Sequence, residues 1–302
     1  MKSVVIRVPA TTANLGPGFD TLGCALTLYN RLSFAKTQNG LSFSHCEPRF
    51  RNPDNLAYRA FQDVFSAAGQ PMPQGIHIDF AETAIPVSRG LGSSAALLAA
   101  GAVAANAFLG NLLTKADLLR ITTKIEGHPD NLAPAIYGGL TASLVENGVP
   151  YAVGAEIAPR FHFCAFIPDY ETDTRSMRKV LPDAVPLSDG TYNVSHTAVL
   201  LQALRLGDAE LSKVALSDRF HEPYRRPLLP GFDEVHAIAM EEGALSLFIS
   251  GSGSTLMALC EDDDFAHRAE KRIASLPQKF RIMPLGIDRV GTVTEVVSDD
   301  DC

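Results

Sequence analysis

The sequence Pro86-Val-Ser-Arg-Gly-Leu-Gly-Ser-Ser-Ala-Ala96 decides how the fold of this chain is interpreted. Two glycines, Gly90 and Gly92, stand directly before an alanine-rich run with the composition of a buried helix. A glycine-rich turn that leads into a helix leaves backbone N–H groups and the positive end of the helix dipole facing outward. This geometry binds phosphate, and Ser93 and Ser94 offer hydroxyls to phosphate or Mg²⁺. Taken alone, the stretch is better explained as a turn before a core helix that Ser93 or Ser94 caps.

Two known nucleotide-binding patterns fit the stretch poorly. It is not a P-loop, because no lysine follows Gly92. It matches the looser dinucleotide pattern G-x-G-x-x-A at Gly90, Gly92 and Ala95. However, a polar stretch and Pro86 separate it from the preceding predicted strand, and the acid expected about 20 residues onward falls in a break at 110–111. A nicotinamide oxidoreductase is therefore a distant alternative.

The composition favours a small-molecule partner. The chain has 302 residues, 46% of them hydrophobic, which is enough for a large core and suggests two domains. Its 34 acidic residues outnumber the 26 lysines and arginines, giving a net charge of -8, which argues against a nucleic-acid or anionic-membrane surface. The N-terminal residues lack a signal-peptide pattern, and five scattered cysteines suit reduced thiols, so we expect a cytoplasmic protein.

Hydrophobic periodicity predicts a mixture of strands and helices without an internal repeat. The apolar run 95–113 follows a Gly/Ser loop and contains two asparagines, so we expect a buried helix rather than a membrane span. A linker-like stretch at 148–159 suggests the domain boundary, and the fold class is α+β. The predicted strands are 4–8, 26–35, 41–45, 76–80, 138–145, 161–167, 245–249, 256–260 and 291–297, and the predicted helices are 55–68, 95–109, 114–126, 194–206, 232–242 and 265–275.

Two further loops have the composition of functional segments. Residues 7–23, RVPATTANLGPGFDTLG, place an irregular loop from Thr11 to Gly18 after the first strand. This segment could equally be a simple turn in which Asn14 and Asp20 are solvated. Residues 250–255, SGSGST, join two apolar strands by more residues than a tight hairpin needs, which suggests a backbone cradle or a bulge near the site.

Together the three loops resemble the signature motifs of the GHMP kinase superfamily, and within it the homoserine kinase family. The similarity extends through EGHPDNLAPAIYGG, TRSMRKVLP, DRFHEPYRRPLLPG and LFISGSGSTLMAL, with Thr12 where serine is usual. The resemblance implies a two-domain fold. Residues 1–155 would form an ATP-binding domain like ribosomal protein S5, and residues 156–302 a ferredoxin-like domain.

The resemblance implies transfer of the γ-phosphoryl group of ATP to the side-chain hydroxyl of L-homoserine, a step of threonine biosynthesis. Mg²⁺ would lie between Ser94 and Glu126. Glu126 also stands out physically, because a carboxylate in the last turn of a helix is unfavourable unless a cation offsets it. The implied ATP-binding residues are Pro86, Val87, Ser88, Arg89, Gly90, Leu91, Gly92, Ser93, Ser94, Ala95 and Ala96.

Homoserine carries an ammonium, a carboxylate and a hydroxyl, so its site should offer an acid, arginines and a neutral hydroxyl-orienting group. Asp20 matches the acid that binds the ammonium, and Arg178 and Arg225 match the arginines that bind the carboxylate, with Arg226 as a neighbouring candidate. Asn131 would orient the acceptor hydroxyl, while Asp130 is the competing candidate for a general base. The implied catalytic residues are Asn131 and Glu126, and the implied substrate-binding residues are Asn14, Asp20, His128, Asn131, Arg178 and Arg225.

The expected partners are the small molecules ATP and L-homoserine, with a homodimer left open and neither nucleic acid nor membrane involved. A mevalonate-type or sugar alcohol is the alternative acceptor, against which the two arginines with Asp20 favour an amino acid. A binding module without catalysis is disfavoured because the polar set is intact.

Overall fold

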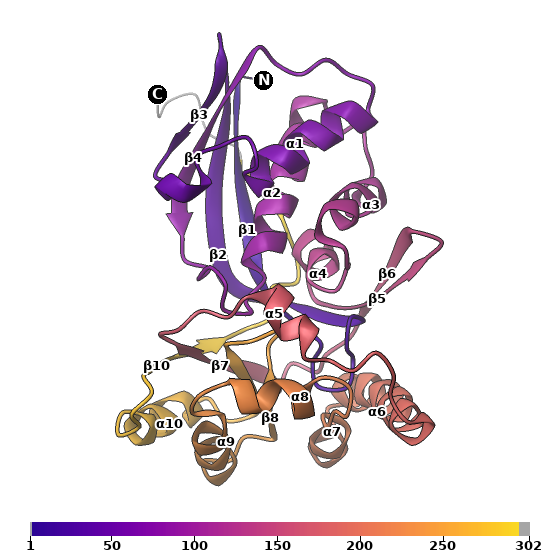
Figure 1. Ribbon diagram of the computed structural model, residues 1–302, viewed down its shortest axis with the longest axis vertical. Coiled ribbons are helices and arrows are strands. Elements are labelled where there is room, and N and C mark those ends of the chain that lie inside the picture. The colour runs from indigo at the N-terminus through magenta and orange to yellow at the C-terminus, as the bar shows by residue number, and fades with distance from the viewer. Residues whose placement is uncertain (1, 296–302) are drawn as a thin grey trace.

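The computed structural model describes residues 2–295, and these residues form two sheets, each with its own helices (Figure 1). Within that range, seven strands form the first sheet and four form the second. Figure 1 shows the first sheet and its helices above the second sheet and its helices, with short α5 (Thr174–Lys179) at the level where the two meet. The predicted α+β class is thereby confirmed.

Two long antiparallel strands form the centre of the first sheet. Its order is β11-β1-β2-β4-β3. In addition, β5 pairs with the first residues of β2, Leu22–Cys24, and β6 pairs with β5. β3 and β4 pair in parallel, and the helix α1 connects them, as a parallel pair requires. The strands are β1 (Ser3–Ala13), β2 (Leu22–Thr37), β3 (Gly40–Ser44), β4 (Gly75–Thr83), β5 (Leu140–Glu146), β6 (Val149–Ala155) and β11 (Val293–Glu295).

Four helices accompany this sheet, and the alanine-rich α2 (Ser93–Phe108) is central among them. A Cβ on Gly101 would lie 1.9 Å from the carbonyl oxygen of Ala57, so glycine is what lets α2 approach α1 this closely. The predicted buried helix is confirmed, and across residues 2–295 no helix has the length and hydropathy of a transmembrane span. The other helices are α1 (Leu56–Ala67), α3 (Lys115–Glu126) and α4 (Leu132–Tyr137).

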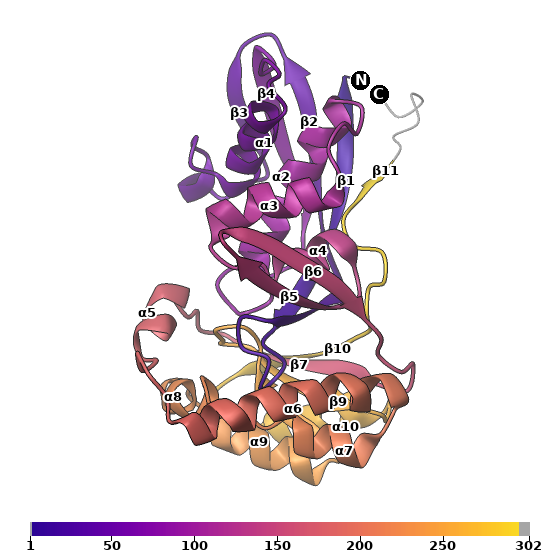
Figure 2. The ribbon, with the colours of Figure 1, turned by 90° about the vertical axis from the view of Figure 1, so that its right-hand side faces the viewer.

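The second sheet has the ferredoxin-like order. Its strands follow one another in space as β10-β7-β9-β8, that is, fourth, first, third and second in chain order, all antiparallel. Figure 2 shows the helices of this half beneath the sheet. The strands are β7 (His162–Pro168), β8 (Ser246–Ile249), β9 (Leu256–Cys260) and β10 (Phe280–Leu285), and the helices are α6 (Leu187–Leu206), α7 (Ala209–Ala215), α8 (Glu222–Arg225), α9 (Phe232–Glu241) and α10 (Phe265–Ile273).

Three sequence-based expectations about these elements are wrong. The first strand was expected to end at Val8, but β1 continues to Ala13, into the predicted loop. It can do so because Pro9 coincides with a register shift, and pairing with β2 resumes beyond it. The predicted linker 148–159 contains β6, which pairs along its length with β5. The predicted last strand is β11, and it pairs with β1 of the first sheet, so it does not belong to a C-terminal unit 156–302. Residues 296 and 297 of that prediction lie outside the described residues.

Candidate active site

A polar cleft at the junction of the two halves brings the predicted site residues together. Its lining includes Gly251 and Ser252 of the third loop and Thr174 of α5, which the sequence did not single out. The predicted residues that line the cleft are Asn14, Asp20, Ser88, Arg89, Gly90, Gly92, Ser93, Ser94, Glu126, His128, Asp130, Asn131, Arg178 and Arg225.

The loop predicted to bind phosphate ends in a helix that no side chain among residues 2–295 caps. α2 begins at Ser93, and its N-cap residue is Gly92, with φ +67° and no side-chain cap hydrogen bond. The expected cap by Ser93 or Ser94 is therefore wrong, and the first N–H groups of a 16-residue helix stay available for an anion. Leu91, Ala95 and Ala96 are fully buried, so these three predicted ATP-binding residues do not line the cleft.

The hydroxyl that was expected as a cap instead meets a carboxylate. Ser94 Oγ donates to Glu126 Oε1, and Glu126 is the last residue of α3, which Gly127 ends as predicted. Burial raises the pKa of Glu126, against the smaller lowering effects of Ser94 and His128, while Asp130 adds to the rise. A half-buried carboxylate and a hydroxyl beside this loop are hard oxygen donors of the kind that Mg²⁺ prefers.

His128 and Asp130 form a charged pair in the cleft. His128 Nδ1 lies 2.6 Å from Asp130 Oδ1, and Asp130 is 2% exposed. Burial lowers the pKa of His128, but the hydrogen bond and charge of Asp130, aided by Glu126 and Asp20, outweigh burial and raise that pKa to about 9. The same Asp130 oxygen accepts the backbone N–H of Asn131 at 2.9 Å. Asp130 therefore holds an imidazolium and the turn before α4, which argues against the competing role as a free base.

Opposite charges from the two halves face each other at the end of the cleft that contains Asp20 and Arg178. Arg178 donates from Nη2 to Asp20 Oδ1 at 2.7 Å and from Nη1 to Asp20 Oδ2 at 2.9 Å. Arg225 is 2% exposed, and burial, with the charge of Arg178 adding to it, lowers the pKa of Arg225 to about 10. Arg226 does not share this site, because its Nε donates to Asp233 on the surface at 2.6 Å.

Asn14 joins the loop that follows β1 to the loop at residues 250–255. Its Nδ2 donates to the carbonyl of Gly251 at 2.8 Å, and its Oδ1 accepts the N–H of Asp20 at 3.1 Å. Gly251 N–H in turn donates to the carbonyl of Ala13 at 3.1 Å. The expectation that residues 250–255 approach another part of the site is confirmed, and both ends of the Asn14 amide are engaged within the protein.

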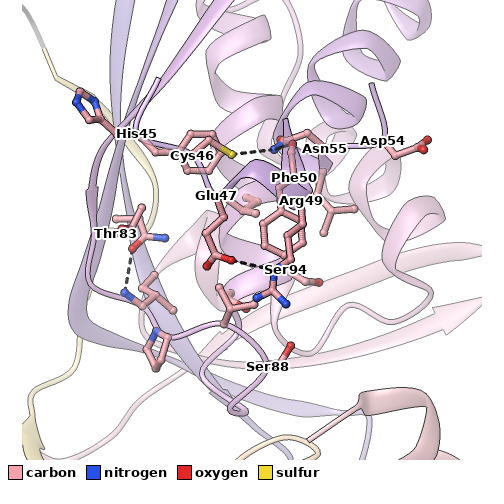
Figure 3. Close-up of a pocket in the computed structure, with 18 of the residues that line it drawn as sticks. His45, Cys46, Glu47, Arg49, Phe50, Asp54, Asn55, Thr83, Ser88 and Ser94 are labelled. Atoms are coloured by element: carbon pink, nitrogen blue, oxygen red, sulfur yellow. Dashed lines mark hydrogen bonds and ion pairs between the residues drawn. The ribbon is translucent and has the colours of Figure 1, made fainter. Parts of the chain in front are cut away.

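A second, larger cavity adjoins the cleft and was missed by the sequence reasoning. It has a volume of about 630 Å³ and shares Ser88, Ser93 and Ser94 with the cleft. Figure 3 shows Glu47, Phe50 and Ser94 gathered around it. The predicted ATP-binding residues Pro86 and Val87 line this cavity, together with Asn30, Phe80, Thr83, Ile85 and Leu97. Another wall comes from the segment between β3 and α1 and from the first residue of α1, and the mixed polar and aromatic run HCEPRFR at 45–51 was the available signal for it. The members of this wall are His45, Cys46, Glu47, Arg49, Phe50, Asn52, Asp54, Asn55 and Leu56.

The cleft has an uncapped helix N-terminus on one side and paired charges on the other, and two family models identify the chain as a kinase of the GHMP type. Models of two domains match the chain: "GHMP kinases N terminal domain" at residues 55–139 and "GHMP kinases C terminal" at residues 200–278. A mevalonate kinase of Methanococcus jannaschii, with a TM-score of 0.69, 14% identity and coverage of 94% of this chain and 98% of that one, shares the fold.

Curated relatives are closer still. A homoserine kinase of Clostridium botulinum (strain Okra / Type B1) is 40% identical over 292 residues, covering 96% of this chain and 98% of the relative. A homoserine kinase of Clostridium beijerinckii is 39% identical over 290 residues, covering 95% and 97%. The crystal structure of homoserine kinase from Cytophaga hutchinsonii superposes with a TM-score of 0.89 at 27% identity and covers 98% of each chain. The chain belongs to the homoserine kinase family.

Proposed function

We propose that the protein transfers the γ-phosphoryl group of ATP to the side-chain hydroxyl of L-homoserine in the cleft between its two halves, a step of threonine biosynthesis. The observation that carries the proposal is the pairing of Asp20 with Arg178 beside buried Arg225. An amino acid carries one ammonium and one carboxylate, which match this acid and these arginines. Neither mevalonate nor a sugar alcohol offers an ammonium to Asp20.

ATP would occupy the larger cavity and the phosphate loop together. The cavity of about 630 Å³ accommodates a nucleoside, with Phe50 offering an aromatic face, and its shared wall of Ser88, Ser93 and Ser94 leads to the N-terminus of α2. The phosphates would accept N–H groups from Gly90, Gly92 and the first turn of α2. Among the predicted ATP-binding residues, Leu91, Ala95 and Ala96 are fully buried and would support the loop and helix rather than contact ATP.

Mg²⁺ would be held by Ser94 and Glu126. The described residues contain no group of three or more His, Cys, Asp or Glu side chains that could hold a metal, so the protein supplies few ligands. This small donor set fits Mg²⁺, which keeps several waters and takes phosphate oxygens as ligands. When bound, the ion neutralises charge on the phosphates. Glu126, with its half-buried carboxylate, would be the chief protein ligand.

In the reaction, the homoserine hydroxyl oxygen forms a bond to the γ-phosphorus while the bond to the leaving ADP oxygen breaks. The hydroxyl proton passes to an oxygen of the transferred group. Asn131 holds the acceptor hydroxyl, and the His128 imidazolium places a positive charge beside the reacting groups. Phosphoryl transfer needs mainly positioning and charge neutralisation, so a strong protein base is unnecessary.

The proposal includes a cytoplasmic location, a homodimer as the assembly to be tested by light scattering, and ATP and L-homoserine as the ligands. The four described cysteines, Cys24, Cys46, Cys164 and Cys260, are buried and unpaired, which supports a reducing compartment. Cys302 lies outside the described residues.

A coupled ADP-release assay tests the proposed reaction. With ATP and Mg²⁺, L-homoserine should support turnover, while mevalonate and galactose should not. D20N should raise the KM for L-homoserine and leave the KM for ATP unchanged, because the lost charge faces the ammonium. Turnover with mevalonate or galactose instead of L-homoserine would refute the acceptor, and thermal stabilisation by NAD(P) instead of ATP with Mg²⁺ would refute the kinase.

A further inference from the structure

A buried hydroxyl lies beneath the phosphate loop, at the point where the loop meets Asn131. Thr11 of β1 is fully buried, and its Oγ1 donates to Asn131 Oδ1 at 2.7 Å. Its backbone N–H donates to the carbonyl of Leu91 in the loop at 3.2 Å. A Cβ on Gly92 would lie 1.9 Å from Thr11 Oγ1 and 3.1 Å from Asn131 Oδ1. Thr11 therefore joins the loop to Asn131 directly, in space that only a glycine at position 92 leaves free.

The contact with Thr11 determines which end of the Asn131 amide faces ligands. A carboxamide has an oxygen that accepts and a nitrogen that donates. Thr11 occupies the oxygen, while Nδ2 makes no hydrogen bond to any residue among 2–295, and Asn131 lines the cleft. The two N–H groups of Asn131 are thus the half of the side chain that remains for a substrate oxygen.

We infer that Thr11 is a positioning residue for the phosphoryl transfer: its hydroxyl fixes the Asn131 amide so that N–H groups point into the cleft and hold the oxygen of the acceptor hydroxyl. A hydroxyl oxygen held by a donor keeps a lone pair free to attack phosphorus. Without the Thr11 hydroxyl, the amide can turn over and present its oxygen, which cannot donate. The inference rests on the proposed function, because it requires that Asn131 contacts the acceptor.

Two substitutions at Thr11 separate the hydroxyl from the shape of the side chain. T11V keeps the volume and removes the donor, and it should lower kcat about tenfold or more, with the KM values for ATP and L-homoserine within about twofold of the wild type. T11S restores the hydroxyl and should return kcat to within about threefold. Unchanged kcat in T11V, or a T11S variant as slow as T11V, would overturn the inference.

A matched control tests whether any buried threonine would behave in this way. Thr292 is 4% exposed, and its Oγ1 donates to the carbonyl of Ala135 at 2.8 Å, outside the cleft. T292V loses the same group from a similarly buried hydrogen bond and should keep the wild-type kcat. An equal loss of kcat in T292V and T11V would show that general loosening, rather than the Asn131 amide, slows the reaction.

The variant N131L distinguishes failure of this inference from failure of the proposed function. If Thr11 acts through Asn131, T11V should add no further loss of kcat in an N131L background. N131D, which still accepts the Thr11 hydroxyl but cannot donate, should be as slow as N131L, and it remains informative even if T11V folds poorly. Full activity of N131L would refute the proposed role of Asn131 itself. A slow N131L whose kcat falls again on adding T11V would refute only the role of Thr11.

Discussion

The substitution R225K tests the substrate end of the cleft most directly. Arg225 is 2% exposed, and it donates from Nε to the carbonyl of Met177 at 3.2 Å and from Nη1 to the carbonyl of Gly251 at 3.0 Å. These bonds leave other guanidinium N–H groups for the carboxylate of homoserine. The three N–H donors of a lysine radiate from one nitrogen and cannot reach both carbonyls and the substrate as the wider, planar guanidinium does. Burial would also lower the pKa of its ammonium toward neutrality.

The size of the effect follows from the loss of a charge-assisted hydrogen bond in a buried site. Such a bond contributes about 1.5–3 kcal/mol, which corresponds to a fall of about 10- to 150-fold in kcat/KM for L-homoserine. Arg178 is 45% exposed, so solvent screening limits R178K to about fivefold or less. The difference between the two variants is therefore itself a prediction from their burial.

The assay is steady-state ADP release at varied L-homoserine and saturating ATP, with Tm measured for each variant. R226K is the matched control, because Arg226 is 50% exposed and pairs with Asp233 at the surface. It should behave as the wild type. If R225K, with an unchanged Tm, kept the wild-type KM and kcat/KM for L-homoserine, the reasoning about the carboxylate would be wrong.

Three further predictions concern the remaining parts of the site. The folded-state pKa of His128 is raised from 6.5 to about 9, so its pairing with Asp130 stabilises the fold fully below pH 6.5, and this stabilisation is lost as pH rises through 9. The difference in the free energy of unfolding by urea between the wild type and D130N should therefore shrink from pH 6 to pH 10. A difference that stays constant would contradict the pair. G92A should lower kcat/KM about 100-fold, because its Cβ would lie 1.9 Å from Thr11 Oγ1. G110A is the control: Gly110 also has a positive φ, +74°, but no atom lies within 4 Å of its added Cβ, so kcat/KM should not change. Equal effects of the two variants would contradict the steric argument. E126Q should lower kcat about 100-fold and raise the Mg²⁺ concentration needed for the half-maximal rate. E146Q, at an exposed position, should change neither quantity. An unaltered Mg²⁺ dependence in E126Q would show that Glu126 is not part of the metal site.

Local signals in the sequence were sufficient for elements that are stabilised locally. The predicted helix 114–126 corresponds to α3, whose ends are defined by the Thr114–Asp117 capping box and by Gly127. Ser94 shows where such reasoning fails. Its position before an apolar run predicts a cap, but its hydroxyl bonds to Glu126, 32 residues away. A helix signal cannot anticipate a partner on another element.

In the candidate site, too, the sequence indicated single residues but not the contacts between residues of distant elements. Motif resemblance named Asp20, Arg178 and Arg225, which the structure places in one cleft, although nothing in the sequence could show that Asp20 and Arg178 pair with each other. The motif also left open whether Arg226 belongs to the site. The structure answers this, because Arg225 lines the cleft while Arg226 pairs with Asp233 at the surface. The cavity wall at 45–56 carries no glycine signature, because side-chain shape rather than backbone geometry forms it.

The pairing of β11 with β1 has a consequence for the order in which the chain folds. A ribosome releases β1 first and β11 last, yet Val5 lies opposite Glu295 in the finished sheet. Until that final segment emerges, one edge of β1 has unpaired N–H and C=O groups that can pair with another chain. Completion of the first sheet therefore waits for synthesis of the second sheet and its helices, and a stalled nascent chain would present an open strand edge to its neighbours.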